Sequence, residues 1–531
     1  MKNYTAIFKA TIACLLLAAA ESQATVVLPA PFSSSMVVQQ HKPVLIWGKA
    51  DAGETVTATF CEKSATTRAT EAGTFRIELP ALDAKSNPGP HELSVIGSNT
   101  IVLKDVLLGE VWLCGGQSNM RLTVKEAAHG DKESSEANYP QIRLLYVPGL
   151  SSAKPEFTFA GKWAPCKPGT VAGFSAAAYY FGRELHQTLG VPVGLIDCSQ
   201  GWSPAEAWLP LSVLSSDPIT KPIVDRQLKL AAEKDLDVRD KEYRAELAVW
   251  KAAQAKAKVG GADKSSSTQP DAPRPKKPFG VDPRLRAEAL FNSMLAPLRP
   301  MPLAGVIWYQ GESNSDRARQ YRTLLPMVIK TWRQEFQSPE LPFGIVQLPQ
   351  HVNKERPVDG TWAELRDAQL RTHRAIPNTG LIVTTDIGEP FDIHPRNKQD
   401  VGKRLAGWAL SSVYGQAKIP SCPLYKSVAI EGSRAKVEFD GNFTGLTVKG
   451  DALNDIFIAG DDKKFVPAKA EIQGNAVVVW SDEVKAPVAV RYAWSDNPKC
   501  NLFSTDGLPA SPFRTDDWPG ITDGVLTTDW Q

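Results

Sequence analysis

The sequence has little of several features that would define a protein class at once. Its 531 residues include only 7 cysteines and 7 histidines, and no two cysteines form a C-x-x-C pair. Cysteines this sparse exclude a disulfide scaffold, and without paired spacing they predict no metal site. Positive charge is also not in excess, because 60 Lys and Arg face 58 Asp and Glu. With both signs interspersed, we expect no nucleic-acid partner.

Long apolar runs are absent beyond the N-terminus, so we expect no membrane span. Residues 1–24, MKNYTAIFKATIACLLLAAAESQA, combine two lysines with a short apolar run and the small-x-small pattern Ser22-Gln23-Ala24. The run is shorter than the roughly 20 residues that a span needs. We therefore predict a cleavable signal peptide and a secreted or periplasmic protein. In such a compartment, bridges Cys166–Cys198 or Cys422–Cys500 and buried free thiols are alternatives.

Two β-rich regions flank a central region of alternating strands and helices. Residues 25–104 contain short β-type runs separated by Gly, Pro and Asp, which predicts a small β-sandwich-like domain. From residue 105, near-continuous apolar strands alternate with amphipathic helices, the pattern of a parallel sheet covered on both faces. Residues 418–531 return to β-type runs. The sequence thus predicts an α/β domain at 105–417 between two all-β domains.

The α/β pattern is interrupted at about residues 220–280. Residues 225–258 are rich in Ala, Lys and Glu at helical spacing, and residues 260–277, GGADKSSSTQPDAPRPKK, have the composition of a flexible linker. We predict a helical insertion whose charges form a solvated face rather than a binding patch.

Four segments place small or polar residues directly after predicted strands. They are GGQSNM with Ser118, DCSQGWSPAEAW with Gly201, WYQGESN with Gln310, and DIGEPFDIHP with His394. Open parallel sheets place their sites at the carboxyl ends of the strands. We therefore expect the four segments to meet at one edge of the sheet.

Each segment offers one component of a nucleophilic serine site. The glycines before Ser118 permit a sharp turn, and a helix starting there would direct its N–H groups at a developing anion. The N–H of Gly201 and the amide of Gln310 are candidate donors to that anion. A carboxylate would fix the tautomer of His394, and three are close in sequence: Asp386, Glu389 and Asp392. Taken singly, each segment is equally compatible with a helix cap, a turn or a polar loop.

The set resembles the sequence blocks of the SGNH/GDSL hydrolase superfamily, most closely its sialate O-acetylesterase branch. The matching blocks are GQSNM, GWSPAEAW, WYQGESN and DIHPRNK, and the likeness extends to VRYAW and GLPASPFRTDDW near the C-terminus. The resemblance implies a flavodoxin-like three-layer α/β/α domain with a parallel sheet. It also implies a serine esterase that removes O-acetyl groups from carbohydrates and needs no metal or organic cofactor.

The same resemblance assigns roles to individual residues. It implies that Ser118 is the nucleophile, His394 the general base and Asp392 the carboxylate that orients His394. The oxyanion hole would consist of the N–H groups of Ser118 and Gly201 and the side-chain amide of Gln310. Substrate contacts are expected from the residues around these positions, namely Gln117, Asn119, Trp202, Glu312 and Asn314.

Two positions depart from the family pattern. Trp202 stands where relatives often have a second glycine, which would add a wall on which a sugar ring stacks. The superfamily usually spaces its acid as D-x-x-H, whereas this chain has D-x-H. Asp386 and Glu389 are therefore alternatives to Asp392, and a Ser–His dyad without a strong acid is a third.

The expected substrate is a 9-O-acetylated sialic acid, with acetylated xylan or another glycan as the alternative. A sialate carboxylate would require a cation, for which Arg121, Arg317 and Arg396 are candidates. Two rival classes are a glycosidase that uses Glu312 with Asp386 or Asp392, and a non-catalytic carbohydrate-binding protein.

Overall fold

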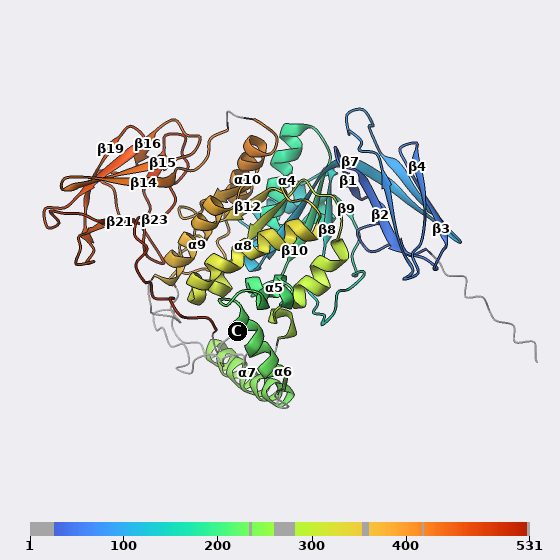
Figure 1. The fold of residues 1–531 in the computed structure, drawn as a ribbon, viewed down its shortest axis with the longest axis horizontal. Helices are drawn as coiled ribbons and strands as arrows, with labels where there is room; N and C mark the ends of the chain where they lie inside the picture. The colour runs from blue at the N-terminus through green and yellow to red at the C-terminus, as the bar shows by residue number, and fades with distance from the viewer. Residues whose placement is uncertain are drawn as a thin grey trace, which may run out of the picture.

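The structure is a computed structural model that describes residues 26–232, 236–259, 275, 282–352, 360–416 and 419–527. Figure 1 shows a central body of helices around a sheet, with β-rich units at both ends. The predicted signal peptide lies outside the described residues, and so does the predicted linker apart from Pro275. Within the described ranges, no helix has the length and apolar character that a membrane crossing requires.

A large mixed sheet occupies the centre, which confirms the predicted α/β class. Six neighbouring strands run parallel in the order β13, β12, β11, β7, β10, β8, and β9 joins β8 antiparallel. Their bounds are β7 (Thr100–Gly116), β8 (Tyr139–Tyr146), β9 (Ala164–Cys166), β10 (Val193–Ser199), β11 (Gly305–Tyr309), β12 (Phe343–Val346) and β13 (Thr379–Ile382). Every residue of β10, β11 and β12 is buried, as expected for parallel strands packed on both faces.

Helices pack against both faces of this sheet, because alternate residues of a strand point to opposite sides. On one face, Trp112 of β7 packs edge-on against Phe181 of α4 and Trp408 of α10. On the other face, a Cβ at Gly115 would lie 2.9 Å from the ring of Trp332 of α8. The covering helices are α4 (Ala176–Leu189), α8 (Ala318–Glu335), α9 (Thr361–Ala375) and α10 (Lys398–Ser412).

The strand β7 belongs to two parts of the fold. Its first residues, Thr100–Val106, pair antiparallel with β6, whereas Glu110–Gly116 pair parallel with β10, and Trp112–Gly116 with β11. The N-terminal unit consists of β1 (Val37–Gln39), β2 (Val44–Lys49), β3 (Thr55–Phe60), β4 (Lys63–Arg68), β5 (Thr74–Leu79) and β6 (His91–Ile96). The expected boundary between residues 104 and 105 therefore falls inside one continuous strand.

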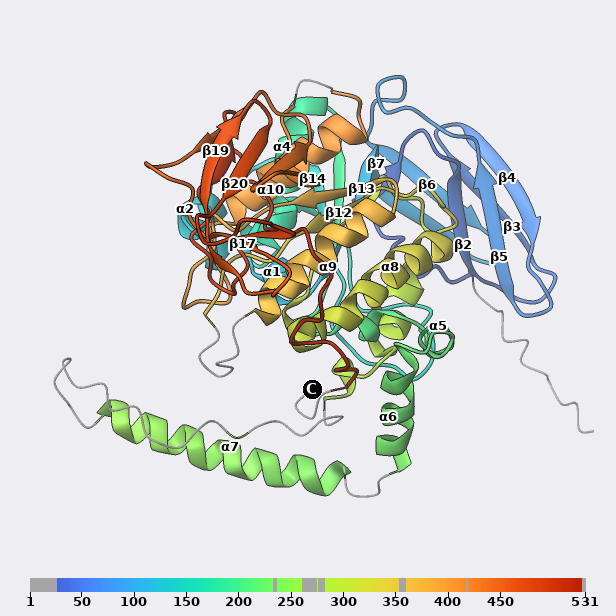
Figure 2. The same cartoon turned by 60° about the vertical axis from the view of Figure 1, so that its left-hand side comes forward.

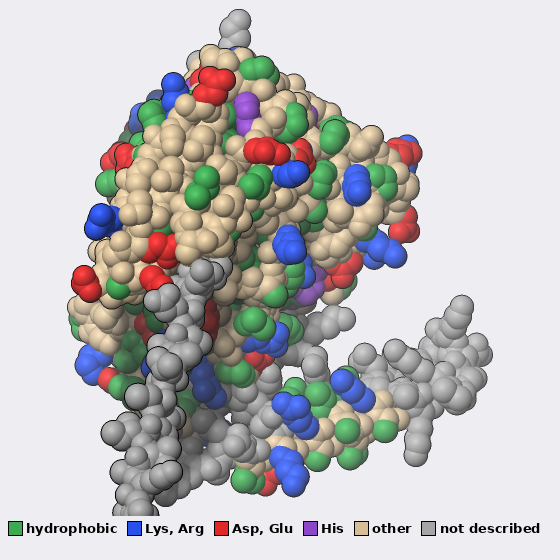
Figure 3. All heavy atoms as spheres, turned by 90° about the vertical axis from the view of Figure 1, so that its right-hand side faces the viewer, with side chains coloured by type: hydrophobic (Ala, Val, Ile, Leu, Met, Phe, Trp, Pro, Cys, Tyr) green, Lys and Arg blue, Asp and Glu red, His purple; other side chains and the backbone are tan. Residues whose placement is uncertain are grey.

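Shorter helices and the insertion complete the central body. The short helices are α1 (Ser118–Arg121), α2 (Gly130–Glu136), α3 (Pro168–Val171) and α5 (Leu211–Ser215). Two helices, α6 (Lys221–Ala232) and α7 (Leu236–Val259), occupy the stretch predicted as a helical insertion. Figure 2 shows α7 lying away from the central sheet. On the face drawn in Figure 3, the side chains of Lys and Arg are interspersed with those of Asp and Glu.

The C-terminal unit contains several small sheets. Its strands are β14 (Leu424–Glu431), β15 (Arg434–Asp440), β16 (Leu446–Val448), β17 (Ile456–Ala459), β18 (Val466–Pro467), β19 (Lys469–Gln473), β20 (Ala476–Trp480), β21 (Ala489–Tyr492), β22 (Leu502–Ser504) and β23 (Phe513–Arg514). The six cysteines within the described residues are all free thiols, so neither of the two candidate bridges is formed.

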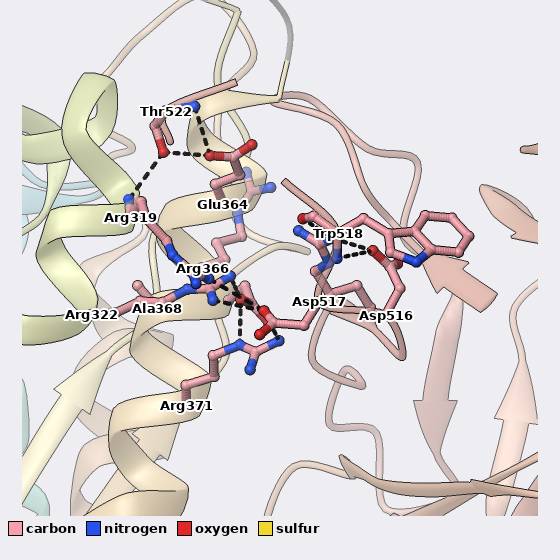
Figure 4. Close-up of polar contacts among 12 residues, drawn as sticks. Arg319, Arg322, Glu364, Arg366, Ala368, Arg371, Asp516, Asp517, Trp518 and Thr522 are labelled. Atoms are coloured by element: carbon pink, nitrogen blue, oxygen red, sulfur yellow. Dashed lines mark hydrogen bonds and ion pairs between the residues drawn. The ribbon is translucent and has the colours of Figure 1, made fainter. Parts of the chain in front are cut away.

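The chain returns to the central body after β23, as Figure 4 shows. One oxygen of Asp517 lies 3.0 Å from Arg322, 3.3 Å from Arg319 and 3.4 Å from Arg371. Farther along, the Glu364 carboxylate on α9 accepts the N–H groups of Ile521 and Thr522. These contacts fasten the C-terminal segment to α8 and α9.

Candidate active site

Three of the four predicted segments meet because their strands end in register. Gly116 at the end of β7 aligns with Ser199 of β10 on one side and with Tyr309 of β11 on the other. Ser118, Gly201 and Gly311 each lie two residues beyond the end of their strand. The fourth segment lies in the loop between β13 and α10.

The turn before Ser118 requires glycine. Gly116 has a φ of 139°, and a Cβ there would lie 2.1 Å from the backbone oxygen of Tyr309. The next residue anchors the turn, since the Gln117 N–H donates to the same oxygen at 3.0 Å. Ser118 then begins α1 and is half-buried. Because α1 is only four residues long, the expected contribution of a helix dipole at Ser118 is small.

Gly201 lies directly beside the candidate nucleophile. A Cβ at Gly201 would be 3.8 Å from the Cβ of Ser118, so a larger side chain would crowd the hydroxyl. Among the residues that the structure describes, no acceptor is found for the backbone N–H of Ser118 or of Gly201. Two N–H groups next to a serine hydroxyl are thus free to bind a substrate oxygen.

The loop that carries His394 is joined to the residue after Ser118. The amide of Asn119 donates to the backbone oxygen of Ile393 at 2.8 Å. His394 itself is half-buried, and within the described ranges neither ring nitrogen has a hydrogen-bond partner, Ser118 included. Catalytic hydrogen bonds are often long in ligand-free enzymes and tighten when substrate binds. Burial lowers the pKa of His394, and the charge of Lys398 lowers it further.

Of the three candidate carboxylates, only Asp392 acts directly on His394. Its Oδ1 accepts the backbone N–H of His394 at 2.9 Å, rather than a ring N–H. The Asp392 charge nevertheless opposes the lowering of the His394 pKa. A second carboxylate, Glu126, has the same electrostatic effect, and sequence reasoning missed it. The signal was present as a Thr123-x-x-Glu126 capping box just after the serine segment.

The other two candidates are engaged elsewhere. Asp386 forms a two-pronged ion pair with Arg404 of α10, with both N–O distances at 2.7 Å. One oxygen of Glu389 accepts the backbone N–H of Arg396 at 2.9 Å. Both carboxylates therefore stabilise the loop around His394 and not its ring.

Gln310 is fully buried, and its amide is already bonded. The Nε2 donates to Asn314 Oδ1 at 2.7 Å and to the Ser203 oxygen at 3.2 Å, while Oε1 accepts from the Tyr321 hydroxyl at 2.8 Å. An amide nitrogen has two hydrogens. Gln310 can donate to an oxyanion only by giving up the longer bond to Ser203.

Four of the five residues expected to touch substrate lie inside the protein, which differs from the prediction. Gln117, Asn119, Glu312 and Asn314 are 0–6% exposed. Their side chains bond to backbone and side chains of the neighbouring segments. Trp202 is the exception, with 65% of its surface exposed and a φ of 67°. Within the described residues, no group of three His, Cys, Asp or Glu side chains is placed to hold a metal ion.

Comparisons with known proteins identify the family of this chain. A family model described as carbohydrate esterase, sialic acid-specific acetylesterase, matches residues 284–411. A solved carbohydrate acetylesterase from Xanthomonas citri is 34% identical, with a TM-score of 0.76, covering 93% of this chain and all of that one. The chain belongs to a family of carbohydrate acetylesterases. The prediction of an esterase is thereby confirmed.

Mammalian relatives of this esterase are similar along nearly their whole length. The sialate O-acetylesterase of Mus musculus is 28% identical, covering 91% of this chain and 93% of the mouse protein. That of Homo sapiens is also 28% identical, covering 93% and 94% respectively.

Replacing Gln310 by alanine tests whether its amide assists the esterase. If Gln310 donates to the oxyanion after releasing Ser203, we expect kcat to fall about 10²–10³-fold in this variant. Tyr321→Phe is the matched control, since it removes a bond to Gln310 Oε1 and leaves the donor in place. Steady-state kinetics on p-nitrophenyl acetate measure both variants. A Gln310→Ala enzyme with kcat within twofold of wild type would remove the amide from the mechanism.

Proposed function

We propose that this esterase is a secreted serine enzyme that removes acetyl groups from 9-O-acetylated sialic acids through an acyl-serine intermediate. The observation that supports it best is the alignment of strand ends that brings Ser118 beside the N–H of Gly201. Asn119 joins the same point to the loop of His394.

The proposed reaction has two steps. His394 takes the proton of the Ser118 hydroxyl, whose oxygen attacks the acetyl carbonyl. The resulting oxyanion is stabilised by the N–H groups of Ser118 and Gly201, joined by Gln310 after it releases Ser203. The tetrahedral intermediate collapses when His394 returns the proton to the leaving sugar oxygen. Water, deprotonated by the same histidine, then attacks the acyl-serine, and the histidine returns that proton to the Ser118 oxygen as acetate is released.

Two side chains are proposed to bind the sugar. Trp202 offers an exposed ring beside Gly201 for stacking. Arg121 ends the turn that begins at Ser118 and would meet the sialate carboxylate. Its guanidinium lies 4.1 Å above the ring of Tyr146 and 3.2 Å from the buried Asp197. Arg317 is not suited to this role, because it is buried and donates to Glu206.

We also propose the finer organisation that the sequence suggests. The parallel sheet with helices on both faces fits a three-layer SGNH-type catalytic domain at residues 105–417. The β-rich units at 25–104 and 418–531 would flank it as separate all-β domains, and cleavage after Ala24 would direct the enzyme to secretion.

Acetate release tests the proposed substrate. The purified enzyme is compared on 9-O-acetylated N-acetylneuraminic acid and on acetylated xylooligosaccharide, with a serine-directed phosphonate identifying the labelled residue by mass spectrometry. The proposal expects faster release from the sialic acid and a phosphonate on Ser118. Preference for the xylooligosaccharide would contradict the substrate, and a label elsewhere would contradict the mechanism.

The pH dependence of kcat/KM follows from the state of His394. Only the neutral imidazole can accept the Ser118 proton, so activity rises as pH passes upward through the His394 pKa. Burial and Lys398 hold that pKa below the usual value of about 6.5. We therefore expect half-maximal kcat/KM below about pH 6.5. A midpoint clearly above this value would contradict the assignment of His394 as a buried general base.

A further inference from the structure

Lys398 occupies a position that is unfavourable for a cation. It is fully buried and is the first residue of α10, where the helix dipole is positive. Burial lowers the pKa of its ammonium to about 7. A buried cation at the positive end of a helix is unfavourable, and residues placed against local preference in this way are expected at functional sites. The hydrogen bonds of Lys398 indicate which part of the candidate site it stabilises.

The Lys398 ammonium and the Asn119 amide hold the backbone on both sides of His394. Lys398 Nζ donates to the oxygen of Pro395 at 2.8 Å, and Asn119 Nδ2 donates to that of Ile393 at 2.8 Å. The two side chains are bonded to each other, since Nζ also donates to Asn119 Oδ1 at 2.7 Å. Both flanking carbonyls of His394 are therefore fixed by one connected pair.

The pair is anchored on the nucleophile side as well. Asn119 follows Ser118 directly, and its Nδ2 donates to Glu312 Oε1 at 2.6 Å. The ammonium of Lys398 also lies 5.2 Å from the centre of the Tyr309 ring, at the end of β11. The amide of Asn119 uses both hydrogens and its oxygen in this network. No hydrogen of the Asn119 amide is left to donate to a substrate.

We infer that Lys398 and Asn119 are positioning residues, which fix the loop of His394 against the turn of Ser118 and so set the distance between base and nucleophile. The inference rests on the proposed Ser118–His394 mechanism. Displacing a reacting group by about 1 Å can cost 10²-fold in rate. The effect therefore falls on kcat and leaves sugar binding unchanged.

Methionine and glutamine at position 398 provide a matched pair. Their side chains have the same length, but only glutamine can donate hydrogen bonds. We expect Lys398→Met to lower kcat on p-nitrophenyl acetate about 10²-fold with KM within about threefold. Lys398→Gln should recover at least about tenfold of this loss. Both variants remove the cation beside the buried Glu312 and should lower the free energy of unfolding, methionine more than glutamine because it donates to neither Pro395 nor Asn119.

The charges around His394 make its pH profile a second readout. The groups that act on His394 are Lys398, Asp392, Glu126 and the nearby His351. The charge of Lys398 lowers the pKa of His394. Its removal should therefore raise that pKa and move the midpoint of kcat/KM to higher pH in both variants. The methionine–glutamine difference in kcat is then measured above that midpoint.

Three further variants make the outcome decisive. Leu405→Ala removes a buried apolar side chain of α10 away from the loop and controls for lost stability alone. Asn119→Asp replaces Lys398→Met if the latter does not fold, because a carboxylate cannot donate to Ile393. Ser118→Ala tests the proposed function separately. The proposed function fails if this variant stays active. The positioning role fails if Ser118→Ala is inactive while Lys398→Met keeps kcat within threefold of wild type, or if methionine and glutamine lower kcat equally.

Discussion

Ser118→Ala is expected to lower kcat for acetyl ester hydrolysis on the order of 10⁵-fold. Without the hydroxyl no acyl-enzyme forms, and only the oxyanion donors and substrate binding are left to assist direct attack by water. The loss should appear with p-nitrophenyl acetate and with acetylated sugars alike, because in the proposed mechanism both react through the same acyl-serine. Labelling by a phosphonate should disappear in parallel.

The fold should not change in this variant. The Ser118 hydroxyl is half-buried and has no hydrogen-bond partner among the described residues, so its removal leaves no buried group unsatisfied. We expect the free energy of unfolding to stay within about 0.5 kcal/mol of wild type. Ser315→Ala is a useful control, since that buried hydroxyl donates to the Glu312 oxygen and faces no substrate in the mechanism. A Ser118→Ala enzyme that retains more than about 1% of kcat would exclude the serine as nucleophile, given the size of the expected loss.

Arg366→Met should be the most destabilising single substitution that we propose. Arg366 of α9 is fully buried and donates to four backbone oxygens at 2.8–2.9 Å, those of Leu348, Pro349, Ser495 and Asp496. Methionine fills the space but donates to none of them. Each buried carbonyl left unpaired costs about 1–3 kcal/mol, so a loss of roughly 4 kcal/mol is expected after partial relaxation.

The same helix supplies the control for Arg366. Arg371 of α9 is half-buried and pairs with the buried Asp367. It also pairs with Asp517, as Figure 4 shows. Because Arg322 also pairs with both Asp367 and Asp517, Arg371→Ala leaves neither carboxylate unpaired and should destabilise much less than Arg366→Met. Urea unfolding followed by tryptophan fluorescence compares the two variants. Equal urea midpoints for Arg366→Met and wild type would show that the four carbonyls find other donors.

The strand ends of the candidate site could be predicted from the sequence, because they are visible as apolar runs followed by glycine. Gly116 and Gly201 gave this signal, and their strands do end side by side. The esterase family could also be recognised from these blocks. Side-chain roles were harder, because polarity near a motif does not distinguish a substrate contact from a buried bond. Asn119 and Glu312 look alike in sequence whether they face a sugar or each other, and only packing decides between the two.

Other residues of the site carried no usable signal. The charges of Asp392 and His394 act on the pKa of His351, yet more than forty residues separate His351 from them in the sequence. Lys398 stands at the start of a helix that is polar on its exposed side, where a lysine is normally solvated. Its complete burial depends on Tyr309 and Asn119, which belong to distant segments. Such contacts arise from the tertiary arrangement and not from local periodicity.

The dual pairing of β7 also bears on how the chain folds as it is synthesised. Its antiparallel partner β6 precedes it by a few residues, whereas the parallel partners β10 and β11 follow much later. The first part of β7 can therefore pair with β6 and β1, which both precede it, before β10 and β11 have been synthesised. The N-terminal strands can therefore hold the strand leading to Ser118 before its later partners have been made.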